Sequence, residues 1–564
     1  MAFGHFKLNL TSVLSAFDAR TKNRLVTICQ EGTKLLPSAL WKNSSVKIAH
    51  DHKFCTPCSY PILYDNPNRN QGELYIMATC VHNDIVGLKN RYLKTSTHDF
   101  TANITSVNRI LDELCHKLRP NFSGPISLEE FVSSKKGKLA TRYKSSVNEI
   151  LTGRFDVEKS SRIKAFIKNE LYDELKPPRM IMGRDPAFNC QYGRFTTPLE
   201  HAMQCLEEVS KGRNFFDRGE QFKEKIFGRW AYECDFSKYE ATQRARLLVL
   251  IELGIWKRLL SDGDYRIVEK LFITKMLKKG VTLSGTKFNF EWCRGSGDMD
   301  TGLFNTLITW VACRYFEDAN NLTPGNFIAD GDDNVIAVPI GKTCKNTFSE
   351  FGLDAKLILR KDYHDIDYCS GKFLQYEPSK FIYVQNVKKI MQNLRVFRKT
   401  KFSHCIGAYY YSLGYMYKIM YNNMPIYTDI ADFLMSFTLN HKHVHYDILE
   451  ELNPEVASAF KASKRVNIDF DTPNVRTELA MAFDFTMAEI RHYSEWYQRA
   501  EFRLASSEDK RYNAPKTPRL LLSAHECHTA ERLLDQAFQN AKFSKAFNNI
   551  EATVQCEKIF SGIT

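Results

Sequence analysis

The segment FIADGDDNVIAV, Phe327 to Val338, decides the fold because it sets three carboxylates between two apolar, β-prone stretches. The acids are Asp330, Asp332 and Asp333, with Gly331 among them, and we expect a β-hairpin with these acids at its tip. Like charges this close repel each other. A cation, or a reaction that uses the acids, is therefore expected there.

Two plainer explanations of the acidic hairpin are available. Asp-Gly is the commonest hairpin turn, so Asp330 and Gly331 alone could form only a turn. A calcium-binding EF-hand loop starting at Asp330 would need glycine where Val335 stands and glutamate where Gly341 stands. The calcium loop is excluded, and the simple turn must be weighed against the neighbouring segments.

Composition bounds the class of protein. The chain has 564 residues, 43% hydrophobic and 25% charged, which indicates a multi-lobed globular body or two to three domains. A net charge of +13 suits a polyanionic partner, nucleic acid or an anionic membrane surface. Fifteen scattered cysteines indicate a reducing compartment. No signal peptide and no membrane-spanning apolar run is apparent, so we expect a soluble intracellular protein.

A second acid ends another predicted strand. The stretch WAYECDF, 230–236, reads as a short buried strand, and a helical pattern follows Ser237 as far as Leu260. Asp235 lies near the end of that strand. Carboxylates at the ends of adjacent strands bind divalent cations, and two ions about 3.5–4 Å apart can activate a hydroxyl and stabilise a leaving pyrophosphate.

The segment GSGDMDTGLFN, 295–305, reads as a glycine turn that opens a helix. Ser296 and Gly297 fall in the turn, whereas Thr301 and Asn305 are four residues apart on one helix face. Such hydroxyl and amide groups can contact a ribose and a template backbone. Taken alone, however, they are usually ordinary hydrogen-bonding residues.

Basic residues, punctuated by proline, precede the predicted strand at 230–236. Arginine makes forked contacts to phosphate, so this stretch can hold a nucleoside triphosphate, although a basic stretch read alone is more often a solvated face. The cations are Lys168, Lys176, Arg179, Arg184 and Arg194.

Taken in order, these segments resemble the RNA-dependent RNA polymerases of positive-strand RNA viruses, specifically the tombusvirus-like group and more distantly the flavivirus-type enzymes. KNELYDELKPPRMI is similar to motif F, DFSKYE to motif A, SGDMDTGLFN to motif B, GDD to motif C, FGLDAK to motif D and YCSGKF to motif E. Each motif is weak alone, but the ordered set is very specific. It covers roughly residues 160–380.

The resemblance implies an α+β right-hand polymerase fold of fingers, palm and thumb. An antiparallel palm sheet would be backed by helices, and the thumb would be mainly helical. The implied divisions are an N-terminal extension and fingers at 1–228 with motif F near 163–194, palm at 229–260 with motif A, a fingers insertion at 261–290, palm at 291–380 with motifs B to E, and thumb and C-terminal region at 381–564.

The resemblance also assigns roles to residues. Asp235 and Asp332 would be the principal ligands of two Mg²⁺ ions, which Mn²⁺ can replace, with Asp333 assisting. Lys356 matches the lysine proposed to protonate the leaving pyrophosphate. The implied nucleotide contacts are Lys168, Lys176, Arg179, Glu240, Ser296, Thr301 and Asn305. The implied RNA contacts are Arg184, Arg194, Gly297, Cys369 and Ser370.

Glu240 departs from the family pattern, which usually has aspartate five residues after the first acid of motif A. Glutamate keeps the charge but adds a methylene, so the geometry around a ribose 2′-hydroxyl must shift. Recognition of ribose by Asn305 and Glu240 is one interpretation. A helper beside the metal and a helix-surface acid are the other two.

The implied partners are single-stranded RNA template, nascent RNA, nucleoside triphosphates, and viral or host replication-complex proteins. The family tends toward de novo initiation. We expect the protein in the cytoplasm of an infected host cell at a membrane-associated replication complex, with only peripheral membrane association through partners.

Three other functions fit the sequence less well. A reverse transcriptase should carry an aromatic steric gate near position 240 and lack the SG…T…N helix. A non-catalytic RNA-binding scaffold would explain the basic charge, but it would not need the complete acid set. A helicase or kinase needs a P-loop, and GKT at 341–343 lacks the upstream glycine.

Two further regions carry predictions. A loose zinc-like spacing is found among His52, Cys55, Cys58, Cys80 and His82. Free thiols are the preferred interpretation, and a structural Zn²⁺ is the alternative. After about residue 395 the pattern is mainly helical. Residues 472–496 predict helix with an apolar stripe of Leu479, Phe483, Met487 and Ile490 that belongs to the core, and 505–518 reads as a surface loop or linker.

Overall fold

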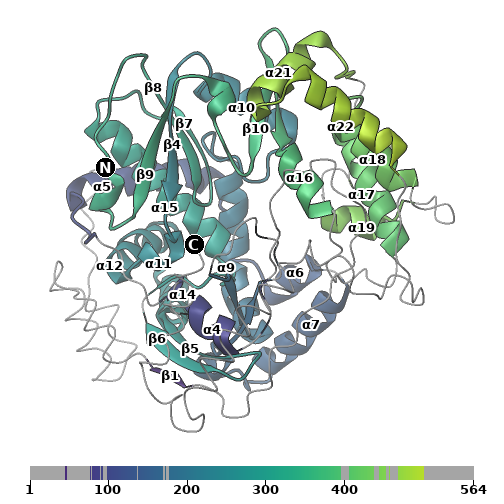
Figure 1. The fold of residues 1–564 in the computed structure, drawn as a ribbon. Coiled ribbons are helices and arrows are strands. Elements are labelled where there is room, and N and C mark those ends of the chain that lie inside the picture. The colour runs from purple at the N-terminus through teal and green to yellow at the C-terminus, as the bar shows by residue number, and fades with distance from the viewer. Residues whose placement is uncertain are drawn as a thin grey trace, which may run out of the picture.

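The computed structural model describes residues 45–47, 77, 79, 81–88, 91–92, 98–394 except 136, 169, 171, 173–176 and 292, and then 406–436, 444–452, 457 and 468–500. Within these ranges it combines helices with a five-stranded, a four-stranded and a two-stranded sheet (Figure 1). Nearly all strand pairs are antiparallel. The predicted α+β class with antiparallel sheets is confirmed at this level.

The four-stranded sheet, hereafter the central sheet, contains the acidic hairpin. Its strand order is β7 (Phe327–Asp330), β8 (Asp333–Val338), β4 (Trp230–Phe236) and β9 (Ala355–Arg360). The strand predicted at 230–236 and the hairpin around Gly331 are thus confirmed.

The central sheet is buried on both faces. Tyr232 and Ile336 face the largest core, which also contains residues of helices α5 (Ile104–Leu118) and α15 (Thr301–Ala319). Val335, one residue along, belongs to a second core shared with α10 (Phe215–Lys225). Successive side chains of a strand point to opposite faces, so the apolar run is what a strand covered on both sides needs.

The five-stranded sheet, hereafter the lower sheet, lies below the central sheet in Figure 1. Its strand order is β1 (Ser45–Lys47), β6 (Lys287–Glu291), β5 (Leu277–Thr282), β2 (Ile163–Ile167) and β3 (Met180–Arg184). Strands β2 and β5 pair in parallel, with Ile163 beside Gly280. A Cβ at Gly280 would overlap the Ile163 carbonyl oxygen, so this close pairing requires glycine.

Helices connect and flank the two sheets. The helical pattern predicted from Ser237 to Leu260 is present but broken, because Gln243 and Arg244 are extended. From Ala245 onward the helix continues through a π-helical turn at Val249–Leu253. The other helices as far as α15 are α4 (Val81–Leu88), α6 (Leu128–Ser133), α7 (Gly137–Leu151), α8 (Val157–Ser160), α9 (Pro186–Gln204), α11 (Tyr239–Thr242), α12 (Ala245–Leu248), α13 (Gly254–Leu259) and α14 (Asp262–Met276), with a 3₁₀ turn at Arg119–Asn121.

The C-terminal part is a helical layer on a two-stranded sheet, and it shares one apolar core. Its elements are β10 (Gly371–Glu377), β11 (Lys380–Gln385), α16 (Val387–Leu394), α17 (Ile406–Met420), α18 (Tyr427–Ser436), α19 (Tyr446–Leu452), α21 (Pro473–Phe483) and α22 (Met487–Arg499). Short 3₁₀ turns at Phe348–Glu350 and Tyr363–Asp365 precede it.

The apolar stripe predicted along residues 472–496 is wrong in one respect. Helix α21 ends at Phe483 because Asp484 adopts a left-handed conformation, and Thr486 then caps α22 in a reciprocal capping box with Glu489. Met487 is consequently exposed at the start of the second helix. A Thr-x-x-Glu signal thus outweighs the apolar periodicity.

A polar cluster joins helix α21 to the turn before β10. His364 lies between two carboxylates, with Nδ1 2.7 Å from Asp362 and Nε2 3.3 Å from Glu478. The Tyr363 hydroxyl and the Gln375 backbone N–H also donate to Glu478. In the part of the chain that the structure describes, no helix is both long enough and apolar enough to span a membrane.

Candidate active site

The register of the central sheet brings predicted site residues together at one end. Cys234 on β4 pairs with Asn334 on β8, so continuing this antiparallel register by one residue sets Asp235 opposite Asp333. On the other side of β4, Asp235 pairs directly with Lys356 of β9. Side chains of directly opposed residues share a face. Asp235, Asp333 and Lys356 therefore lie at the same sheet end, and all three are exposed.

Helix α15 fixes the turn that carries the acids. Gly331 has a φ of +70°, which suits glycine. Its N–H donates to the Thr306 hydroxyl at 2.9 Å, and its carbonyl accepts from the Thr309 hydroxyl at 2.7 Å. The Tyr239 hydroxyl lies 2.8 Å from Thr309. Neither threonine is among the residues predicted from the sequence, although their spacing on one helix face is a usable signal.

Negative charge accumulates at the hairpin tip. Burial, and then the charge of Glu240, raise the pKa of Asp332 above its usual value. Asp333 keeps exposed surface, but the protein atoms crowded around its carboxyl, and then the charges of Asp332 and Asp330, raise its pKa to about 7. Asp330 is compensated by Arg218, whose Nη2 lies 3.0 Å away. A cation near Asp332 and Asp333 would relieve this repulsion.

These acids can supply only some of the ligands that a divalent metal ion needs. Among the residues that the structure describes, no three His, Cys, Asp or Glu side chains converge closely enough to hold a metal ion unaided. Mg²⁺ usually takes one or two protein carboxylates and completes its shell with water and phosphate oxygens. The donor set at this sheet end is of that kind.

Glu240 is held in a closed ring of polar contacts. Ser296 donates through Oγ to Glu240 Oε1 at 2.9 Å, and Arg91 Nη2 lies 3.0 Å from Oε2. The same Nη2 donates to Ser296 Oγ at 3.3 Å. The longer side chain of glutamate therefore connects the motif A helix to the motif B loop. Nothing in the sequence pointed to Arg91, which precedes every recognised motif.

The orientation of Asn305 follows from a buried chain of amides. Arg294 can only donate, and its Nε lies 2.6 Å from Gln243 Oε1. The amide nitrogen of Gln243 therefore faces Asn305, and donates to its Oδ1 at 2.9 Å. This leaves Nδ2 as the Asn305 atom that can donate to a ligand. The neighbouring Thr301 hydroxyl instead donates to Gly295 O at 2.8 Å, within the loop.

Lys168 and Arg179, two of the predicted triphosphate contacts, lie at the loop end of the β2–β3 hairpin, just beyond the pair Ile167 and Met180. Lys168 N–H donates to Arg179 O at 2.7 Å. Both side chains are nearly half exposed and share Glu170 as an acidic partner. The charge of Arg179 acts on Asp332, which places this cation toward the acidic hairpin. Lys176 lies outside the described residues.

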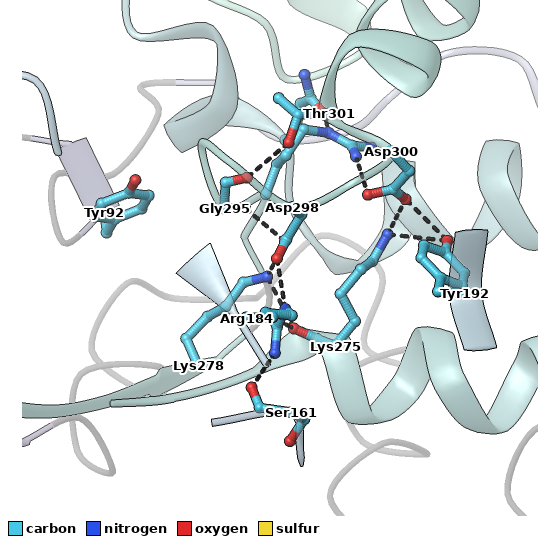
Figure 2. Close-up of polar contacts among 12 residues, drawn as sticks. Tyr92, Ser161, Arg184, Tyr192, Lys275, Lys278, Gly295, Asp298, Asp300 and Thr301 are labelled. Carbon is cyan, nitrogen blue, oxygen red and sulfur yellow. Dashed lines mark hydrogen bonds and ion pairs between the residues drawn. The ribbon is translucent and has the colours of Figure 1, made fainter. Parts of the chain in front are cut away.

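Two buried aspartates anchor the motif B loop (Figure 2). Asp298 accepts from Arg184 Nε and Lys278 Nζ, each at 2.6 Å, and from Gly295 N–H at 3.2 Å. Asp300 pairs with Lys275 and accepts from the Tyr192 hydroxyl at 2.8 Å. The loop that carries Ser296 is therefore fixed to the lower sheet and to helices α9 and α14.

The structure does not place Arg184 where RNA could reach it. Its side chain is only 1% exposed, and its other nitrogens donate to the carbonyl oxygens of Ser161 and Lys275. The prediction that Arg184 contacts RNA is therefore wrong, because a basic stretch of sequence gives no sign that one of its cations is buried. Its acidic partner, Asp298, is over a hundred residues away.

The remaining predicted RNA contacts occupy varied positions. Arg194 is half-buried on α9 and donates to Ile126 O at 2.7 Å. Gly297 is exposed in the motif B loop, with a φ of +101°. Cys369 and Ser370 form the tight turn before β10, both with positive φ. The zinc-like cluster lies outside the residues whose side chains the structure describes.

Comparison with known proteins places the chain among polymerases. The sequence model of a family described as RNA dependent RNA polymerase matches residues 119–464, more than half of the chain. The chain belongs to this family, which confirms the resemblance.

Three relatives come from tombusvirus-like viruses. The RNA-directed RNA polymerase of Groundnut rosette virus (strain MC1) is 25% identical over 319 residues, covering 54% of this chain and 37% of that protein. The Turnip crinkle virus enzyme is 25% identical over 231 residues, covering 38% of this chain and 28% of that protein. For Carnation mottle virus the values are 25% over 228 residues, 37% and 29%. The chain thus spans about a third of the length of these relatives.

Proposed function

We propose that the chain is an RNA-directed RNA polymerase that replicates a positive-strand RNA genome by adding ribonucleoside triphosphates to an RNA 3′ end. One observation carries the proposal. The sheet register sets Asp235 opposite the acidic hairpin, and the motif B residues Ser296 and Asn305 come from the loop and helix beside it. A simple turn at Gly331 would need none of these neighbours.

The proposed architecture is a right hand. The palm is the central sheet with α15, the fingers include the lower sheet, and the thumb includes the helical layer after β11. The divisions at 1–228, 229–260, 261–290, 291–380 and 381–564 are retained as part of this proposal. The lower sheet takes strands from both segments assigned to fingers, 1–228 and 261–290.

In the proposed mechanism, the growing strand's 3′-hydroxyl attacks the α-phosphate of the nucleotide and pyrophosphate leaves. Asp235, Asp332 and Asp333 would hold the divalent ions, Mg²⁺ with Mn²⁺ as a substitute, which supply charge stabilisation at the attacking and leaving oxygens. Lys168, Lys176 and Arg179 bind the triphosphate, and Thr301 also contacts the nucleotide. Lys356 donates a proton to the leaving pyrophosphate from the strand next to Asp235.

Ribose recognition is assigned to Glu240 and Asn305. A 2′-hydroxyl can donate one hydrogen bond and accept another. Glu240 supplies an acceptor and Asn305 Nδ2 a donor, so a ribose satisfies both groups and a deoxyribose satisfies neither. A site built to bond a hydroxyl rejects the analogue that lacks it, because its polar groups are then left unpaired.

The RNA surface and setting complete the proposal. Arg194, Gly297, Cys369 and Ser370 contact template or nascent RNA, and the net positive charge makes binding sensitive to salt. Initiation is de novo. The protein acts with viral or host replication proteins at a membrane-associated complex in the cytoplasm of the infected cell.

The test is incorporation of labelled nucleotide on a single-stranded RNA template with Mg²⁺ or Mn²⁺, using ribonucleotides and deoxyribonucleotides side by side. Asp332→Asn should abolish synthesis but keep the fold and RNA binding. The exposed Asp365→Asn, a matched change away from the site, should leave synthesis intact.

Other outcomes point elsewhere. A wild-type preference for deoxyribonucleotides would favour a reverse transcriptase. Salt-sensitive RNA binding without any incorporation would favour a non-catalytic replication protein. Loss of RNA binding in parallel with synthesis in Asp332→Asn would contradict a purely catalytic role for that residue.

A further inference from the structure

We propose that Arg91 is a positioning residue that determines how strictly the site selects ribose over deoxyribose, acting through Glu240. The proposal rests on the proposed polymerase function. Arg91 lies outside every motif, yet its guanidinium contacts both the motif A glutamate and the motif B serine.

The contacts restrict Glu240 at both carboxylate oxygens. Oε1 accepts from Ser296 and Oε2 pairs with Arg91, while Arg91 also donates to Ser296. The side chains of Arg91 and Glu240 are 17% and 12% exposed, so water competes little for these contacts. Glutamate has one more rotatable bond than aspartate, and an unrestrained carboxylate would occupy several rotamers. The ring removes this freedom.

Arg91 is itself held from the lower sheet. The next residue, Tyr92, is 2% exposed, and its ring stacks on Phe290 of β6 with the centroids 5.5 Å apart. The Tyr92 hydroxyl donates to Met180 O of β3 at 3.1 Å. Arg91 is therefore anchored on the lower sheet, and it contacts Glu240, which follows strand β4 of the central sheet.

The ring leaves Glu240 able to bind a ligand. An ionised carboxylate has about four acceptor positions, and Arg91 and Ser296 engage one on each oxygen. A ribose hydroxyl can donate to a remaining position without displacing either partner. Arg91 also balances the charge of Glu240 beside Asp332. Removing Arg91 should therefore lower activity with a ribonucleotide more than activity with a deoxyribonucleotide.

The test is the ratio of kcat/KM for a ribonucleotide to that for its 2′-deoxy analogue on the same primed RNA template. In Arg91→Gln this ratio should fall about tenfold or more, mainly through the ribonucleotide, because a charged hydrogen bond is lost. Arg91→Lys keeps a cation but carries it on a more flexible side chain without the planar guanidinium, so it should retain part of the ratio. Glu240→Gln should lower the ratio similarly, and adding Arg91→Gln to it should lower it little further.

The matched control is Arg109→Gln. It removes an exposed arginine that pairs with Asp318 and not with Glu240, so it should leave the ratio unchanged. Equal loss with both nucleotides in Arg91→Gln would overturn the proposal in favour of a direct phosphate contact. An unchanged ratio would show that Arg91 has no role in sugar selection and contributes only to packing. Wild type that incorporates neither nucleotide would instead refute the polymerase function, whereas wild-type activity leaves the ratio as a test of Arg91 alone.

Discussion

Asp298→Asn should destabilise the protein strongly although it changes only one atom. The Asp298 side chain is 1% exposed and balances two buried cations, Arg184 and Lys278, each at 2.6 Å. Asparagine has the same shape but no charge, and its amide nitrogen cannot accept. The variant would therefore bury two cations without their anion.

The magnitude follows from this imbalance. Removing one partner of a buried ion pair costs roughly 3–5 kcal/mol. Burial already lowers the pKa of Lys278 to about 8, against the opposing charge of Asp298. Without that charge Lys278 can lose its proton near neutral pH, so the cost should lie toward the lower end, about 3 kcal/mol.

The assay is denaturant or thermal unfolding at neutral pH, with Asp262→Asn as the matched control. Asp262 pairs with Lys257 at the same 2.6 Å, but its side chain is 82% exposed. Water screens such a pair, so the control should change stability little. Equal losses of stability in the two variants, or no loss in Asp298→Asn, would refute the argument that burial makes this ion pair more important for stability.

Acid pH supplies a second check. Burial would raise the pKa of Asp298, but the charges of Arg184 and Lys278 outweigh it and hold the pKa below its usual value. A carboxyl whose folded pKa is depressed stabilises the fold above its unfolded pKa, about 4, and loses that effect as pH falls through the folded pKa. The stability difference between wild type and Asp298→Asn should therefore narrow at strongly acid pH.

Two further perturbations can be measured by thermal unfolding. Gly219→Ala would drive a Cβ into the Phe381 backbone and should cost about 1–3 kcal/mol. Gly263→Ala, in a helix where a Cβ would meet only the Ser261 hydroxyl at 4.0 Å, should be neutral or slightly stabilising. Equal effects would show that α10 can move away from β11. Burial alone would lower the pKa of His364, but Glu478 and Asp362 outweigh burial and raise it. The stability that protonated His364 contributes should therefore be full below about pH 6.5 and fade as pH rises through the folded pKa. His364→Gln should flatten this decline in stability, and an unchanged pH profile in the variant would contradict the prediction.

Local patterns predicted the elements that carry the motifs. The apolar strand ending near Asp235, the Asp-Gly hairpin and the glycine turn before α15 each have a short-range signal, and the structure contains all three. Their order along the chain also predicted the family. The structure adds the register of β4 against β8, because only this strand pairing sets Asp235 opposite the acidic hairpin.

Contacts between distant segments could not be predicted from a single sequence. Arg184 reads as a surface cation until Asp298 is known to lie beside it, and Arg91 has no pattern at all. The two residues differ in an instructive way. Arg184 was assigned to RNA because its neighbours are basic, whereas Arg91 was overlooked because its neighbours are unremarkable. In both cases the deciding partner lies more than a hundred residues away.

The parallel pairing of β2 with β5 constrains how the protein can be made and divided. Ile163 is synthesised well before its neighbour Gly280, and all of β4 is synthesised between them. Until β5 emerges from the ribosome, β2 presents an unpaired edge that can recruit another chain. The two sheets are therefore topologically interleaved. A cut at residue 228 would separate no independent folding unit, and expression as two fragments should yield an aggregation-prone N-terminal half.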